Sequence, residues 1–213
     1  MENLHNLLNF ILHIDQHLIS FVAIHGAWTY ALLFIIIFCE TGLVITPFLP
    51  GDSLLFAAGT ITASTSQTLN IHALFLLLVI ASFTGNLLNY WIGRFVGPKV
   101  FSMEKSLFFN RKYLEDAHRF YEKHGGKTII IARFMPIIRT FAPFIAGIAK
   151  MSSARFMIYN LASAILWIGA LLYTSFLFGN LPWIKAHFST VIMGIIVASL
   201  LPPVIGYFNK ART

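Results

Sequence analysis

The chain has 213 residues, of which 57% are hydrophobic and 11% charged. Soluble domains carry about a quarter charged residues, so this composition excludes an ordinary water-soluble protein and makes the lipid bilayer the expected solvent. The length accommodates one membrane domain over residues 1–213 and no separate soluble domain. The single cysteine, Cys39, lies in an apolar run and excludes a disulfide framework within the monomer.

Residues 1–26 form an N-terminal segment that we expect to be amphipathic and to lie at the membrane interface. The segment has no basic n-region, and polar residues interrupt its apolar run, so a cleavable signal peptide is not expected. His13 and His17 are four residues apart, a spacing compatible with a metal ion, but no third ligand is evident. We therefore expect neither a metal nor a cofactor.

Three apolar segments without any charged residue predict transmembrane helices. A span needs about 20 apolar residues, because the hydrocarbon layer is about 30 Å thick and a helix rises 1.5 Å per residue. Residues 71–93, 156–179 and 188–209 meet this requirement. The helix that begins at residue 71 is expected to continue to residue 97. The predicted fold class is therefore an all-α polytopic membrane protein.

A fourth apolar region, residues 128–149, contains Pro136 and Pro143. Proline removes a backbone donor and breaks a helix locally, and a broken helix at membrane depth survives only where protein or a water-filled cavity shields it. Lysines lie at both ends of the region, which indicates that both ends face the same side. We interpret it as a re-entrant hairpin with two arms of roughly ten residues.

A matching region, residues 27–63, contains Pro47 and Pro50. The polar stretch 64–70 after it has no Lys or Arg, so this hairpin is expected to open to the opposite side. Its first arm is long enough that a full span stays an alternative. Two inverted repeats of this kind are common in transporters, whose sites lie near the middle of the membrane.

The distribution of Lys and Arg predicts the topology. Seven of the fifteen lie in the stretch 98–127, and none precedes Arg94. Because Lys and Arg accumulate on the cytoplasmic side, we expect 98–127 and the C-terminus in the cytoplasm, and 64–70 and 180–187 outside. Within the basic stretch, residues 111–124 predict an amphipathic helix on the cytoplasmic interface.

Four charged residues stand in the two proline-containing regions: Glu40 and Asp52 in the first, Arg133 and Arg139 in the second. A charge at this depth costs about 3 kcal/mol on insertion scales and marks a functional path by default. Arginine suits phosphate, because its planar fork donates two parallel hydrogen bonds. Desolvation favours the neutral form of a carboxylic acid. We therefore expect the arginines to bind an anionic substrate and the acids to couple protons.

The alternative is that these four residues only form structural ion pairs between the hairpins. Buried ion pairs are poor devices for stability, because the cost of desolvation offsets their attraction, so a site is the preferred interpretation. Asn86 and Asn89 are interpreted as hydrogen bonds between helices rather than as ligands. No nucleophile with a neighbouring base is evident, so an enzyme is not expected.

The charged residues stand in two signatures that resemble those of the DedA family of membrane proteins, of the VTT (SNARE-associated) type. The first is carried by residues 38–42 (Phe-Cys-Glu-Thr-Gly) and 47–53 (Pro-Phe-Leu-Pro-Gly-Asp-Ser), and the second by residues 132–143. Residues 120–126 also fit. The resemblance implies two opposed re-entrant hairpins, a bacterial inner-membrane location, translocation of undecaprenyl phosphate and a link to the proton motive force. It assigns the essential charged positions to Glu40, Asp52, Arg133 and Arg139.

Together with this resemblance, the charged residues lead us to expect a flippase for an anionic lipid carrier, an undecaprenyl or other polyprenyl phosphate, coupled to the proton motive force. Its expected partners are membrane lipids and the polyprenyl phosphate, with no nucleic acid; a homo-oligomer is left open. Two other functions stay open as well. One is a proton-coupled exporter or antiporter of a small solute, and the other is a membrane scaffold that transports nothing.

Overall fold

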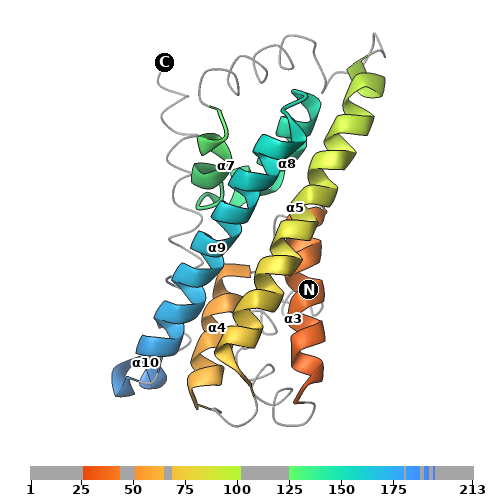
Figure 1. Ribbon diagram of the computed structural model, residues 1–213. Helices are drawn as coiled ribbons and strands as arrows, with labels where there is room; N and C mark the ends of the chain where they lie inside the picture. The colour runs from red at the N-terminus through yellow and green to blue at the C-terminus, as the bar shows by residue number, and fades with distance from the viewer. Residues whose placement is uncertain are drawn as a thin grey trace, which may run out of the picture. The chain divides into compact units, whose positions relative to one another are not determined.

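The computed structural model describes residues 26–43, 51–64, 69–101, 125–179 and 181–187, together with 190–191 and 194. Within these ranges every regular element is a helix, as expected for an all-α membrane protein (Figure 1). The helices are α3 (Trp28–Gly42), α4 (Gly51–Ser64), α5 (Ile71–Phe101), α7 (Lys127–Ala132), α8 (Pro136–Ile148), α9 (Ser153–Phe178) and α10 (Pro182–Ala186).

Two helices are long and apolar enough to cross a membrane. The apolar part of α5, Ile71–Val96, and the whole of α9, Ser153–Phe178, each have 26 residues, or about 39 Å at 1.5 Å per residue. Large apolar side chains on both helices point outward; Ile80 is 54% exposed and Leu166 is 52% exposed. Such surface is expected to face lipid rather than water. Two of the three predicted spans therefore have the required length and composition.

Other parts of the prediction cannot be compared with the structure. The predicted N-terminal segment 1–26, the amphipathic helix 111–124 and the span 188–209 lie outside the described residues, apart from a few positions.

The second proline-containing region is broken, but only once. The short helix α7 ends at Ala132, and α8 begins at Pro136. Between them Met135 is extended, with φ −118° and ψ 103°, because the residue before a proline avoids the helical region. Pro136 then occupies the first position of α8, where its missing N–H costs nothing.

Pro143 does not break the helix, since α8 continues through it to Ile148. The two arms are therefore unequal: α7 has 6 residues and α8 has 13, or about 9 Å and 20 Å. The prediction of two arms of about ten residues each was wrong in this respect. A proline inside a helix removes the hydrogen bond to the carbonyl four residues earlier, and here that carbonyl belongs to Arg139.

The first proline-containing region likewise holds two separate short helices. α3 has 15 residues and α4 has 14, so each is about 22 Å long or less and falls short of a 30 Å hydrocarbon layer. Residues 44–50, which include Pro47 and Pro50, lie outside the described part of the chain.

The chain divides into two compact units, each made of segments that are distant in sequence. The first unit comprises described residues of the ranges Met1–Ile36, Phe48–Val79 and Trp167–Thr213. In it, Gly59 of α4 lies directly against the backbone of Leu172 and the side chain of Ser175 on α9, where any larger residue would clash. The second unit comprises described residues of Ile37–Pro47 and Ile80–Leu166.

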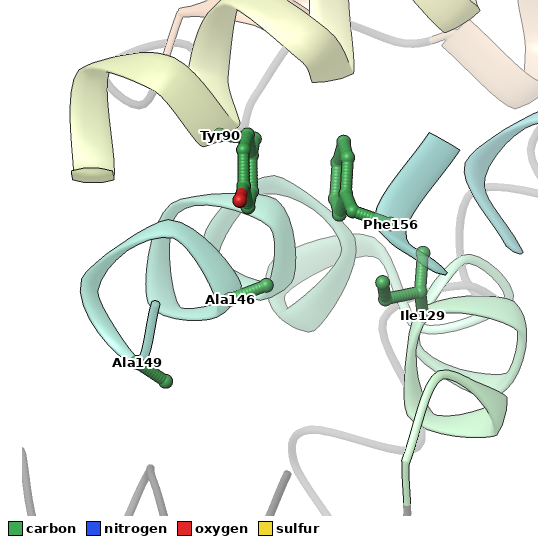
Figure 2. Close-up of a cluster of buried hydrophobic side chains, with 5 residues drawn as sticks. All are labelled: Tyr90, Ile129, Ala146, Ala149 and Phe156. Carbon is green, nitrogen blue, oxygen red and sulfur yellow. The ribbon is translucent and has the colours of Figure 1, made fainter. Parts of the chain in front are cut away.

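The core of the second unit joins α5, α7, α8 and α9. Figure 2 shows the rings of Tyr90 and Phe156 face to face; their centroids are 4.3 Å apart and their planes 17° from parallel. Three smaller side chains complete this cluster: Ile129, Ala146 and Ala149. The cluster fixes the outer ends of the broken region, the start of α7 and the end of α8, against the two long helices.

The turn from α8 to α9 is held by the Tyr90 hydroxyl, which donates a hydrogen bond of 2.5 Å to the carbonyl of Met151. Arg94 donates to the same carbonyl at 3.1 Å. Met151 N–H bonds to the Ala146 carbonyl at 3.1 Å across Lys150, whose φ is 54°. This is a Schellman ending in which a lysine takes the left-handed position that glycine usually fills.

Candidate functional site

The site is built on one face of α5, along which Gly85, Asn89 and Gly93 recur at every fourth residue. A Cβ atom on Gly85 would collide with the Phe38 carbonyl and the Thr41 side chain at the end of α3. A Cβ atom on Gly93 would collide with the backbone of Phe144 in α8. The two glycines therefore let α3 and α8 lie with their backbones directly on α5, as small residues do between membrane helices.

The close approach brings together Glu40, near the end of α3, and Arg139, in the first turn of α8. The Arg139 guanidinium donates to Oε1 of Glu40 and forms an ion pair with it. Both side chains are buried; that of Glu40 is 1% exposed and that of Arg139 is 8% exposed. Two of the four predicted site residues, one from each proline-containing region, are therefore in contact.

Asn89 joins the same two helices, at the residue that follows each member of the ion pair. Its side-chain nitrogen donates to the backbone carbonyl of Thr41 at 3.3 Å and to that of Thr140 at 2.8 Å. Thr41 lies in the last turn of α3, where carbonyls lack a partner within the helix. Asn89 is therefore a hydrogen-bonding residue between helices, as predicted.

Arg133, the third predicted residue, lies at the break after α7 and is 3% exposed. Its guanidinium faces α9, where Nη1 is 3.4 Å from Oδ1 of Asn160 and 3.5 Å from Oγ of Ser163. Asn160 in turn donates to the Phe83 carbonyl of α5 at 3.0 Å. The guanidinium is thus set among amide and hydroxyl groups that are tied to both long helices.

Asn86 completes this network, and it too joins two helices, as predicted. Its amide nitrogen lies 2.9 Å from Oδ1 of Asn160. In the other orientation of the Asn86 amide, its oxygen accepts from Arg133 and its nitrogen donates to the Thr41 carbonyl at 3.2 Å. Either orientation connects the surroundings of Arg133 to α5.

Asp52, the fourth predicted residue, belongs to the first unit, where it is the second residue of α4. A carboxylate is favoured in the first turn of a helix, because it faces the unpaired N–H groups and the positive end of the helix dipole. The indole N–H of Trp167 on α9 donates to Oδ1 of Asp52 at 2.9 Å. Trp167 is itself 2% exposed.

Three side chains in these contacts were not predicted as site residues: Asn160, Ser163 and Trp167. Asn160 stands in an otherwise apolar span, as Asn86 does, and this is the signal by which it could have been found. Trp167 gave no such signal, because an indole does not stand out in an apolar segment as a charged side chain does. Within the described ranges, no three His, Cys, Asp or Glu side chains gather as metal ligands; His13 and His17 lie outside those ranges.

Comparison with known proteins decides the family. The profile of the VTT domain matches residues 49–177. Protein DedA of Escherichia coli (strain K12) is 52% identical over 212 residues, which cover 100% of this chain and 97% of that protein. The chain belongs to the DedA family. The family resemblance read from the two signatures is therefore confirmed.

More distant members of the family are also similar. An uncharacterized membrane protein of Mycobacterium leprae is 40% identical over 183 residues, covering 84% of this chain and 81% of its own. Inner membrane protein YqjA of Escherichia coli (strain K12) is 32% identical over 182 residues, which cover 85% of this chain and 80% of that protein. These family members are named as membrane proteins, which agrees with the two apolar spans. No solved structure gives a significant match.

Proposed function

We propose that this DedA-family protein translocates an anionic lipid carrier, an undecaprenyl or other polyprenyl phosphate, across the bacterial inner membrane. The observation that carries the proposal is the buried Glu40–Arg139 pair, with a second buried arginine, Arg133, in the same unit. A carboxylate and a phosphate monoester compete for the same guanidinium, because both present oxygens that fit its planar fork. The pair is therefore a site that an anionic headgroup can enter by replacing Glu40.

Such an exchange supplies a reason for proton coupling. When the phosphate takes Arg139, Glu40 loses this cationic contact in a buried position, and the loss of a neighbouring cation makes the charged form of a buried carboxyl group less favourable. Binding of the lipid is then accompanied by uptake of one proton at Glu40, and release of the lipid returns it. Asp52 is proposed as a second proton carrier, held in place by the Trp167 indole.

The helix breaks supply the setting for this exchange. We propose that α3 with α4, and α7 with α8, are two inverted re-entrant hairpins, because each of these helices is too short to cross the bilayer. The first N–H groups of α8 have no partner within the helix, and they add donors for a phosphate beside the arginines. Residues 98–127 and the C-terminus are proposed to face the cytoplasm.

The proposal makes the protein a carrier and not an enzyme, with membrane lipids and the polyprenyl phosphate as partners and no nucleic acid. Two rival functions give different results in the same preparation. A proton-coupled exporter would move a small solute in liposomes that lack any lipid phosphate. A scaffold would keep its cellular function after the charges of Glu40 and Arg139 are exchanged, because the ion pair would survive.

The test is a flipping assay with the purified full chain in proteoliposomes that contain a short-chain polyprenyl phosphate. The fraction of lipid phosphate accessible from outside is followed over time, with and without a pH gradient. The proposal predicts protein-dependent reorientation that a gradient accelerates. The same rate in protein-free liposomes and proteoliposomes would contradict it.

A further inference from the structure

Asn89 occupies the point at which three helices of the second unit meet. It is completely buried, and its amide nitrogen donates one hydrogen bond to α3 and one to α8. The acceptors are the carbonyls of Thr41 and Thr140, the residues that directly follow Glu40 and Arg139. One side chain on α5 therefore holds the backbone next to both members of the ion pair.

In the Asn89 side chain, the amide nitrogen makes hydrogen bonds and the amide oxygen does not. The Asn89 oxygen accepts no hydrogen bond from any residue that the structure describes. A buried amide oxygen without a donor is destabilising, so the two hydrogen bonds that the amide nitrogen donates must offset this cost. A hydroxyl could offer one donor, and an apolar side chain none.

The backbone around Asn89 explains why such a tie is needed. Gly85 and Gly93, one turn away on either side, let α3 and α8 approach α5 but make no polar contact through a side chain. Contacts between small residues bring the backbones together without a directed polar bond, whereas the two hydrogen bonds of Asn89 add a fixed geometry between α3 and α8. In a low-dielectric interior such bonds are stronger than in water.

We infer that Asn89 is a positioning residue for the Glu40–Arg139 pair: it ties the end of α3 to the first turn of α8 in the register at which carboxylate and guanidinium meet. Its importance for transport rests on the proposed function, but the tie itself does not. It follows that loss of the two N–H donors separates positions 40 and 139 without touching either side chain.

The test measures this separation directly. In the full chain carrying Cys39→Ala, the substitutions Glu40→Cys and Arg139→Cys are bridged with a short bifunctional methanethiosulfonate. Intact mass then distinguishes the bridged species from chains with two single adducts. Asn89→Ala is expected to lower the bridging rate about tenfold, because both N–H donors that hold the two helices in register are lost. Asn89→Ser, with one donor, should fall between.

The matched control is Ser82→Ala, since Ser82 is also buried on α5 and its hydroxyl has no partner among the described residues. It should leave the bridging rate unchanged. General loss of stability does not alter the ratio of bridged to single adducts while the protein stays monodisperse. If Asn89→Ala cannot be purified, Asn89→Ser decides the matter.

The inference would be overturned if Asn89→Ala were bridged at a rate within twofold of the parent. If Asn89→Ala cannot be purified, the same limit applies to Asn89→Ser. That result would leave the proposed lipid transport standing, because the assay contains no lipid phosphate. Conversely, failure of the flipping assay together with slowed bridging would remove the proposed function and keep Asn89 as the tie.

Discussion

Glu40 and Arg139 are 99 residues apart in the chain, yet their side chains form a buried ion pair between the end of α3 and the first turn of α8. Each comes from one of the two proline-containing regions of the sequence. The pair therefore joins the two halves of the repeat-like pattern, and it does so within one compact unit.

Arg133→Lys should weaken transport by about tenfold or more, although the charge is retained. A lysine ammonium cannot reproduce the planar fork that fits a phosphate, nor span the distances at which Arg133 reaches Asn160 and Ser163. Initial flipping rates in proteoliposomes measure the effect. The control is Arg94→Lys, because Arg94 bonds to the Met151 carbonyl, away from these residues. Equal rates for Arg133→Lys and the parent would remove the support for phosphate binding.

Trp167→Phe should reduce gradient-driven flipping severalfold while preserving most of the packing. The substitution keeps an aromatic ring but removes the indole N–H that bonds to Asp52, and loss of a hydrogen bond to a charged group costs about 1.5–3 kcal/mol. Trp183→Phe is the control, because Trp183 is 65% exposed and its ring stacks on His187, away from Asp52 in the sequence and in its contacts. Similar rates for the two variants would show that Asp52 does not depend on the indole.

Gly93→Ala should lower the melting temperature, because the added methyl group meets the backbone of Phe144, which cannot move aside. Overpacking of this kind typically costs about 1–3 kcal/mol. Gly169→Ala is the contrast: its methyl group would lie 3.5 Å from the Phe75 ring, an ordinary contact. Alanine in a helix is about 1 kcal/mol better than glycine, so this variant should melt at the same temperature or higher. Equal melting of both variants would contradict the close packing at Gly93.

The proposed topology is tested by labelling from outside the cell in a Cys39→Ala background. A membrane-impermeant maleimide should modify Ser66→Cys, in the stretch 64–70, and should not modify Ser106→Cys, in the basic stretch 98–127. Permeabilised cells provide the control that both cysteines can react. The opposite labelling pattern would invert the orientation.

Much of this architecture could be predicted from sequence because its causes are local. Length and apolar composition alone identify the spans in α5 and α9, and Pro136 identifies the break before α8. The four charged residues stand out because charges are rare in apolar segments. The behaviour of Pro143 could not be predicted in this way, because a proline is tolerated inside a membrane helix when neighbouring groups satisfy the freed carbonyl.

The partners of the charged residues could not be predicted either. Sequence offers two acids and two arginines without saying which meet, since pairing depends on how closely the backbones pass. Here Gly42 and Gly85 set that approach, and the result joins Glu40 to Arg139. The surroundings of Arg133 depend on Asn160, which looks like any polar residue in an apolar span until its neighbours across the helices are known.

If Glu40 and the lipid phosphate compete for Arg139, the competition should be visible in the affinity of the Glu40→Gln variant for a short-chain polyprenyl phosphate. Glutamine keeps the shape but removes the competing charge, so binding should be tighter than in the parent and flipping should no longer respond to a pH gradient. Adding Arg139→Gln to the Glu40→Gln variant should abolish this gain in affinity. Melting temperature is measured on the same preparations, because a buried charge left without its partner costs about 3–5 kcal/mol. Binding by Glu40→Gln that is unchanged or weaker, in protein that remains folded, would contradict the claim.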